Sequence, residues 1–103
     1  MAEKSPRRVK LEESLAQDPG DSFLRYGLAL QCLRDGDVAE GRQRLLELIA
    51  DHPEEQVAAY QQLGQSYLEG GEIERARQVL ATGIAKARAR GDWHAAAEME
   101  GLL

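Results

Sequence analysis

Residues 57–90 read VAAYQQLGQSYLEGGEIERARQVLATGIAKARAR, and this stretch decides the fold of the chain. On both sides of Gly71 the apolar residues recur at three- and four-residue spacing, which places them on one face of a helix. Glycine adopts the left-handed conformation that commonly ends a helix. The stretch therefore predicts two consecutive helices joined by a tight turn.

The same pattern occurs once more, 35 residues earlier. A shift of that length superimposes seven identical pairs without a gap: Leu28 and Leu63, Leu33 and Leu68, Gly36 and Gly71, Arg42 and Arg77, Gln43 and Gln78, Leu45 and Leu80, and Ile49 and Ile84. The chain thus contains an internal repeat whose unit is a helical hairpin. One hairpin cannot bury its own apolar face, so we expect the hairpins to stack and share a core.

The flanking sequence also predicts helices. Ser5 before Pro6 is a cap followed by the proline position that starts helices, and Gly91-Asp92 ends one helix and caps another. Asp37, with Glu40 three residues later, resembles a capping box, whereas Glu72 is a poorer cap. Residues 1–5 are expected to be disordered. The six expected helices span roughly 6–17, 22–34, 38–51, 55–69, 73–89 and 92–103.

Composition limits the function classes. The chain has 103 residues, the size of one domain, and a net charge of −5, which argues against non-specific binding of nucleic acid. The basic residues Lys86, Arg88 and Arg90 are interpreted as cations that favour the end of a helix. No apolar run approaches the length of a membrane span, and the N-terminus does not resemble a signal peptide. The predicted compartment is the cytoplasm.

The sequence offers no catalytic constellation. Cys32, the only cysteine, lies on an apolar stripe and is interpreted as a small core residue. His94 and Glu98 are four residues apart, a spacing that a surface ion pair explains as well as a metal site, and His52 precedes a proline in a turn. Phosphate-binding loops and nucleophile elbows are absent from the sequence. We therefore expect neither enzymatic activity, nor a cofactor, nor a bound metal.

These hairpins resemble the tetratricopeptide repeat. In residues 57–90, Tyr60, Leu63, Gly64 and Tyr67 match the motif's first helix, and Ala76 and Leu80 match its second helix. Arg88 replaces the usual proline, which suggests that the second helix continues. Residues 22–55 are a looser copy with departures at Arg25, Cys32 and Gly41.

The resemblance implies an all-α fold of antiparallel hairpins stacked in a right-handed superhelix. Residues 6–17 would form a half-repeat, 22–55 and 57–90 the two repeats, and 92–103 a capping helix. The small residues would let helices approach closely and the large ones would fill the space between them. The core residues implied are Leu28, Ala29, Leu45, Leu63, Gly64, Tyr67, Ala76 and Leu80.

The resemblance also implies a binding groove lined by the first helix of each repeat. It would hold a protein or peptide partner against Phe23, Tyr26, Leu30, Leu33, Arg34, Ala58, Gln61, Gln65, Leu68 and Glu69. Alternatively, the N-terminal helix covers Phe23, Tyr26 and Leu30. Some members of the family grip a C-terminal carboxylate, but Tyr26, Leu30 and Gln62 at the corresponding positions do not match that clamp.

A second hypothesis belongs to a different class. Two repeats with flanking helices leave apolar end faces, and Met99, Leu102 and Leu103 could pair with a second copy of the chain. The protein would then be a self-assembling, homodimeric structural protein. A fold of this kind does not by itself identify the partner.

Overall fold

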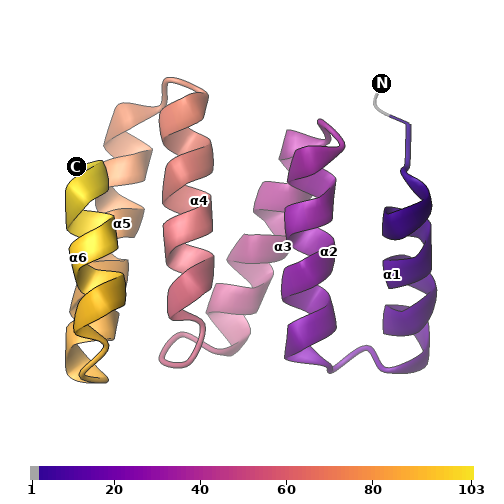
Figure 1. Ribbon diagram of the computed structural model, residues 1–103, viewed down its shortest axis with the longest axis horizontal. Coiled ribbons are helices and arrows are strands. Elements are labelled where there is room, and N and C mark those ends of the chain that lie inside the picture. Colours follow the sequence, from indigo (N-terminus) through magenta and orange to yellow (C-terminus); the bar gives the residue numbers. More distant parts are fainter. Residues whose placement is uncertain (1–2) are drawn as a thin grey trace.

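The computed structural model describes residues 3–103, which form six α-helices and no strand (Figure 1). The helices are α1 (Pro6–Gln17), α2 (Ser22–Arg34), α3 (Val38–Asp51), α4 (Val57–Glu69), α5 (Ile73–Ala89) and α6 (Trp93–Leu102). The predicted all-α fold is confirmed. Two of the rough bounds differ slightly: α4 begins at Val57, after a turn formed by Pro53, Glu54 and Glu55, and α6 is one residue shorter at each end.

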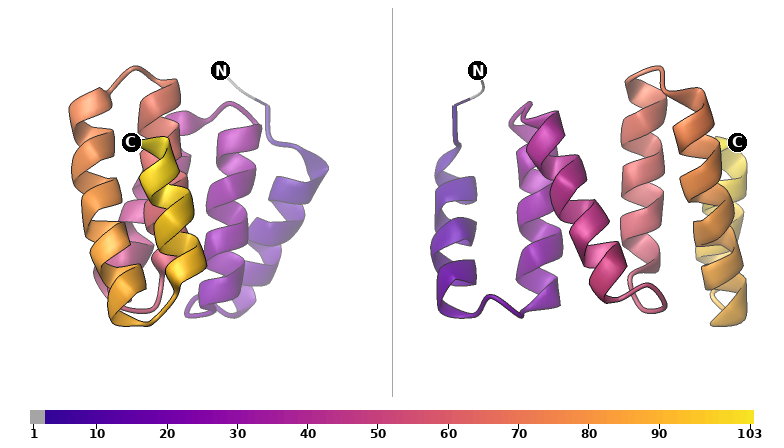
Figure 2. Two further views of the ribbon diagram at one scale, coloured as in Figure 1. Left: turned by 60° about the vertical axis from the view of Figure 1, so that its left-hand side comes forward. Right: turned by 180° about the vertical axis from the view of Figure 1, so that it is seen from behind.

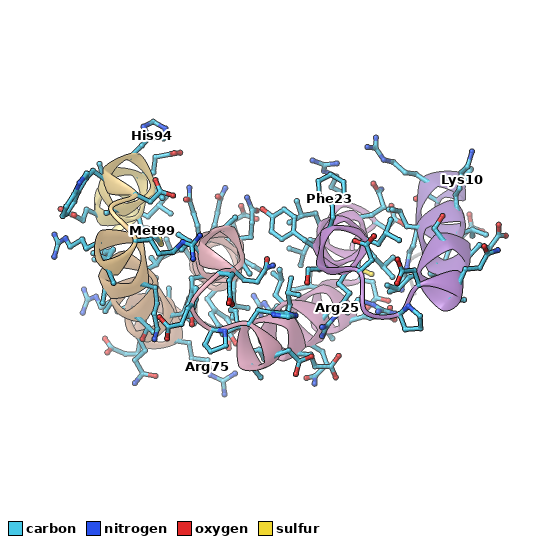
Figure 3. All side chains as sticks on the ribbon, turned by 90° about the horizontal axis from the view of Figure 1, so that it is seen from below. Lys10, Phe23, Arg25, Arg75, His94 and Met99 are labelled. Carbon is cyan, nitrogen blue, oxygen red and sulfur yellow. The ribbon has the colours of Figure 1, made fainter. Side chains whose placement is uncertain are left out.

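The helices stack as antiparallel hairpins. Helices α2 and α3 form one hairpin and α4 and α5 the next, and α3 packs on α4 in the same way as α1 packs on α2 and α5 on α6. We call α2, α4 and α6 the first helices, and α1, α3 and α5 the second helices. Figure 3 shows the first helices side by side in an upper row, with α3 and α5 below them and α1 beyond α2. Helix α1 lies at one end of the stack and α5 and α6 at the other (Figures 1 and 2).

The three turns that follow α2, α4 and α5 have one geometry. Gly36, Gly71 and Gly91 have φ values of 85°, 77° and 73°, a region that side chains rarely adopt. At each turn the glycine N–H and the next N–H donate to carbonyls of the last helical turn, as Gly71 does to Leu68 and Glu72 to Tyr67. The chain therefore reverses sharply at the positions that the glycine spacing predicts.

Side-chain caps start four of the helices. Ser5, Asp21, Asp37 and Asp92 accept hydrogen bonds from backbone N–H groups in the first turn of α1, α2, α3 and α6. Glu72 makes no such bond, as its type predicts. The reciprocal half of the predicted capping box is wrong. The Glu40 carboxylate pairs with Arg8 and Arg44, and the Asp37 N–H donates to the Cys32 carbonyl.

Two apolar clusters form the core. One joins α2, α3, α4 and the start of α5 and includes Leu45 and Leu63; the other joins α4, α5 and α6 and includes Leu80 and Met99. All eight residues assigned to the core in the sequence are buried. Gly64 permits the closest approach, because a Cβ there would lie 2.5 Å from Leu80.

Helix α1 is attached to the stack by a buried arginine. Arg8 is only 1% exposed, and its Nη2 lies 3.0 Å from Asp37 Oδ2 and 2.9 Å from Glu40 Oε1. The Ser5 N–H donates to the Asp35 carboxylate at 3.0 Å. Of the stretch expected to be disordered, residues 1–2 lie outside the described part of the chain, and Ser5 is held by these bonds. The sequence gives no sign of this role for Arg8.

Candidate functional site

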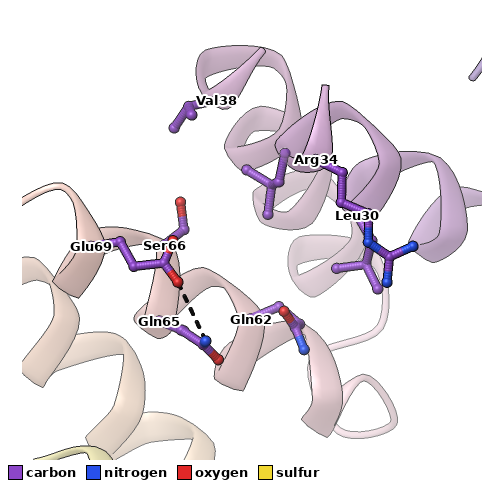
Figure 4. Close-up of a pocket in the computed structure, with 8 residues that line it drawn as sticks. Leu30, Arg34, Val38, Gln62, Gln65, Ser66 and Glu69 are labelled. Carbon is purple, nitrogen blue, oxygen red and sulfur yellow. Dashed lines mark hydrogen bonds between the residues drawn. The ribbon is translucent and has the colours of Figure 1, made fainter. Parts of the chain in front are cut away.

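A shallow hollow of about 300 Å³ lies between α2 and α4 on the first-helix layer (Figure 4). Its α2 side carries Leu30, Leu33 and Arg34, and Val38 follows from the start of α3. Its α4 side carries Gln62, Gln65, Ser66 and Glu69. The hollow exists because α2 and α4 belong to successive hairpins and touch each other little, whereas each packs closely on its own second helix.

The two sides of the hollow differ in chemistry. The α2 side is mainly apolar, whereas the α4 side offers amide and hydroxyl groups. At one end Gln65 Nε2 donates to Glu69 Oε1 at 3.3 Å (Figure 4). Arg34 and Glu69 bring one charge of each sign to the rim. An arrangement of this kind can bury apolar side chains on one side and hydrogen-bond main-chain groups on the other.

The structure brings together part of the predicted groove. Leu30, Leu33, Arg34, Gln65 and Glu69 line the hollow. Among the other predicted residues, Leu68 is half-buried against both core clusters, and Gln61 donates to Glu98 of α6 at 3.5 Å. Ala58 is exposed at the start of α4. Leu33 also packs into the core, where its side chain fills the space over Gly41.

Helix α1 does not cover the aromatic residues equally. Phe23 is 86% exposed and projects from the same side as His94, so the alternative in which α1 covers it is wrong (Figure 3). Tyr26 is half-buried against the core. Burial raises the pKa of Tyr26, an effect that Gln62 and Arg34 partly oppose. Among the described residues, Phe23 is the large apolar side chain with the highest exposed fraction.

Three residues that line the hollow were not assigned to the groove from the sequence. They are Val38, Gln62 and Ser66. Ser66 is buried and held by Arg42, whose Nε donates to its hydroxyl at 2.9 Å and whose Nη2 donates to its carbonyl at 2.8 Å. In the sequence, Gln62 stands out only as a residue that does not match the family's carboxylate clamp. Ser66 carries no signal of its own in the sequence, because its place depends on an arginine 24 residues earlier.

Outside the hollow, several polar groups form pairs with each other. His94 Nε2 lies 2.8 Å from Glu98 Oε1 on the surface of α6. Cys32 is fully buried, and burial raises the pKa of its thiol, which disfavours the reactive thiolate. The basic residues of α5 reach other segments, with Lys86 on Glu54 and Arg88 on Glu100.

Residues 3–103 hold neither a metal-ligand cluster nor a membrane span. Within that range, no group of three His, Cys, Asp or Glu side chains is placed to hold a metal ion. The helices described there are also too short or too polar to cross a membrane.

The stacked hairpins, the repeated glycine turns and the hollow between first helices define a helical-repeat protein. Tetratricopeptide repeat profiles match residues 33–99 and residues 1–59. The chain belongs to the tetratricopeptide repeat family, so the resemblance seen in the sequence is confirmed.

Relatives of similar size support the assignment. The chain is 32% identical over 93 residues to the TPR repeat-containing protein PA0015 of Pseudomonas aeruginosa, a match that covers 90% of this chain and 88% of that protein. It is also similar to the solution structure of a tetratricopeptide repeat domain protein from Salinibacter ruber, with a TM-score of 0.76 and 28% identity over 82% of this chain and 84% of the other. The solution structure of protein BPP2914 from Bordetella parapertussis gives a TM-score of 0.83 and 25% identity, over 96% and 85% of the two chains.

Proposed function

We propose that this protein is a non-catalytic module that binds a segment of another protein on its first-helix layer. Tetratricopeptide repeats generally mediate protein–protein interaction, and the chain belongs to that family. The single observation that carries the proposal is the hollow between α2 and α4, which combines an apolar side with an amide-bearing side. Phe23 lies exposed on the same layer and supplies an aromatic anchor of the kind on which binding energy concentrates.

The chemistry of the hollow favours an extended segment with apolar side chains. Leu30 and Leu33 would contact those side chains, and Gln62 and Gln65 would hydrogen-bond the main chain of the partner. The rim charges of Arg34 and Glu69 would then favour a segment whose own charges alternate in sign, because like charges opposite each other disfavour binding. The net negative charge of the chain as a whole disfavours nucleic acid as the partner.

The test compares proteins captured from a lysate of the source organism by wild type and by two variants. The groove variant is Phe23→Ala/Gln65→Arg, which changes two exposed side chains of the first-helix layer. The control variant is Arg75→Ala/Gln78→Ala, which changes two exposed side chains of α5. Circular dichroism establishes that both variants keep the helical content and melting temperature of the wild type.

The proposal predicts a set of proteins retained by wild type and by the control variant but lost by the groove variant. Backbone amide shifts on titration with a peptide from such a partner should then concentrate on α2 and α4. Equal capture by all three proteins, with shifts on α3 and α5, would place binding on the opposite layer and overturn the proposal.

A further inference from the structure

The two end helices of the stack each have an uncovered side. Inside the stack, α4 packs between α3 and α5, and α2 packs between α1 and α3. Helix α6 packs on α5 and α4, and α1 packs on α2 and reaches α3 only through Arg8. Figures 1 and 2 place these two helices at opposite ends of the molecule, so neither can cover the other within one copy.

The uncovered side of α6 is the side that a second helix would occupy. The sequences of α4 and α6 align with a shift of 36 residues. In this alignment Leu63 of α4 corresponds to Met99 of α6, and both side chains are fully buried. The same shift places Val57 on Trp93 and Tyr67 on Leu103. In α4 both of these residues are buried in clusters that include α5, whereas Trp93 is 65% exposed and Leu103 is 60% exposed.

The uncovered side of α1 is the side that a first helix would occupy. The sequences of α1 and α3 align with a shift of 34 residues, so that Arg8 corresponds to Arg42. Each of these arginines forms an ion pair with a carboxylate in the turn of the next hairpin. Leu11 then coincides with Leu45. A hollow of about 290 Å³ lies here, lined by residues of α1 alone: Arg7, Lys10, Leu11 and Ser14.

The charges of the two uncovered sides are opposite. Arg7 and Lys10 make the hollow on α1 basic. On α6, Glu100 stands at the position of Gly64, the residue that faces the next second helix inside the stack. In the α4–α5 geometry this position faces Leu80, which corresponds to Leu11 of α1. Glu100, which pairs with Arg88 of its own α5, would therefore also lie close to Arg7 and Lys10 of a helix docked in that place.

We propose that the uncovered side of α6 binds the uncovered side of α1 in a second copy of the chain. The two helices would then pack on each other as α4 and α5 do within one copy. The copies then associate head to tail, and each buries Trp93 and Leu103 of one partner against α1 of the other. Arg7 occupies the place of the small residue Gly41, so the helices approach less closely than inside the stack. The association is consequently weaker than the internal packing and sensitive to salt, because it depends on exposed charges.

The rival arrangement, a two-fold pair of α6 helices, has less support from these side chains. Antiparallel α6 helices paired through the side that carries Trp93 would bring Glu100 of two copies together and would leave the basic hollow on α1 uncovered. A head-to-tail contact uses both uncovered sides at once. It also extends without closing unless the rotation between copies forms a ring, which distinguishes it from a dimer.

The first experiment measures mass and tryptophan fluorescence against concentration. Sedimentation velocity should show the average mass of the 11.4 kDa chain rising beyond two copies as the concentration increases, and falling again in about 0.5 M salt. Trp93 is the only tryptophan, so its emission should shift to shorter wavelength over the same concentration range as it is buried. A single-copy mass at millimolar concentration, with no shift in emission, would overturn the proposal.

A mixing experiment with two blocked variants tests the polarity of the contact. Arg7→Glu/Lys10→Glu blocks α1, and Trp93→Glu/Glu100→Lys blocks α6; all four residues are exposed. Each variant alone should be monomeric, whereas their mixture should form a two-copy complex that grows no further, because each variant keeps one native face. Arg75→Glu on α5 is the control and should associate like wild type. Loss of association only in the α6 variant would indicate the two-fold pair and overturn the head-to-tail arrangement.

Discussion

The guanidinium of Arg8 and the carboxylate of Asp37 are joined at 3.0 Å across two helices, and this pair fixes α1 to the turn between α2 and α3. Arg42 does the same for the next hairpin, with its Nη1 2.6 Å from Glu72 Oε2 and its guanidinium over the ring of Tyr67. Helices α1 and α3 therefore each carry an arginine that reaches the turn of the following hairpin. The ion pair between a second helix and the following turn therefore occurs in two successive hairpins.

Loss of Arg8 should detach α1 from the stack. Although burial disfavours its charge, Asp37 and Glu40 hold the pKa of Arg8 above its ordinary value. Breaking a buried ion pair costs about 3–5 kcal/mol, but both carboxylates here are about one-third exposed and stay partly hydrated, so we expect roughly 2–3 kcal/mol for Arg8→Ala.

Urea unfolding followed by circular dichroism measures the effect of Arg8→Ala. Arg75→Ala, at an exposed arginine of α5, is the matched control and should change the free energy of unfolding by less than about 0.5 kcal/mol. Equal stabilities of the two variants would show that Arg8 does not hold α1. Faster hydrogen exchange in α1 alone would localise the loss.

Acid should weaken the same junction. The Ser5 N–H bond lowers the pKa of Asp35, and the hydrogen bond from Arg44 is the main reason that the pKa of Glu40 is lowered. A carboxylate whose pKa is lower when folded stabilises the protein above its unfolded pKa of about 4, and this contribution is lost as the pH falls through the folded value. We therefore expect stability to fall steeply below about pH 4.

The acid prediction is checked with Asp35→Asn. This variant should be less stable than wild type at neutral pH, and the difference should shrink as the pH falls from about 5 to 3, because wild type loses what the variant already lacks. Glu13→Gln, at an exposed carboxylate of α1, provides the same charge change without the Ser5 bond. A difference between Asp35→Asn and wild type that is constant with pH would contradict the prediction.

The fold was predictable because its signals are local and repeat. The Gly36 and Gly71 turns and the apolar spacing around Leu28 and Leu63 lie within single hairpins, so one sequence is enough to read them. Arg8 and Ser66 could not be placed in this way. Their roles depend on partners 29 and 24 residues away, and a polar residue on a helix gives no sign of such a partner until the hairpins are stacked.

The hollow was predictable only in part for a related reason. The family pattern assigns residues by their position in the first helix, and it placed Leu30 and Gln65 on the rim. It does not say how successive hairpins pack on each other, and in the structure Leu68 packs against the core while Gln62 lines the hollow. Phe23 is 86% exposed, whereas Gly27, one turn further along α2, lies against Leu11 of α1, so α1 covers a different side of α2.

Leu63→Ala should be strongly destabilising. Leu63 of α4 is fully buried in the cluster that joins α2, α3, α4 and α5, and removal of a buried leucine side chain costs about 2–5 kcal/mol because a cavity remains. Leu46→Ala is the control, since Leu46 lies exposed on α3 and should cost less than about 1 kcal/mol. Thermal melts that coincide for Leu63→Ala and wild type would disprove the packing of the core.

Two glycine-to-alanine variants should shift stability in opposite directions. Gly71 has a φ of 77°, a conformation in which alanine costs about 1–2 kcal/mol, although space for a Cβ is available. Gly101 lies in α6, where a Cβ would meet open space, so alanine there should stabilise the helix by a few tenths to about 1 kcal/mol. Chemical denaturation of both variants measures the two shifts. If Gly71→Ala unfolded at the wild-type denaturant concentration, the left-handed turn between α4 and α5 would be wrong, whereas a neutral Gly101→Ala would indicate only that the last turn of α6 is frayed.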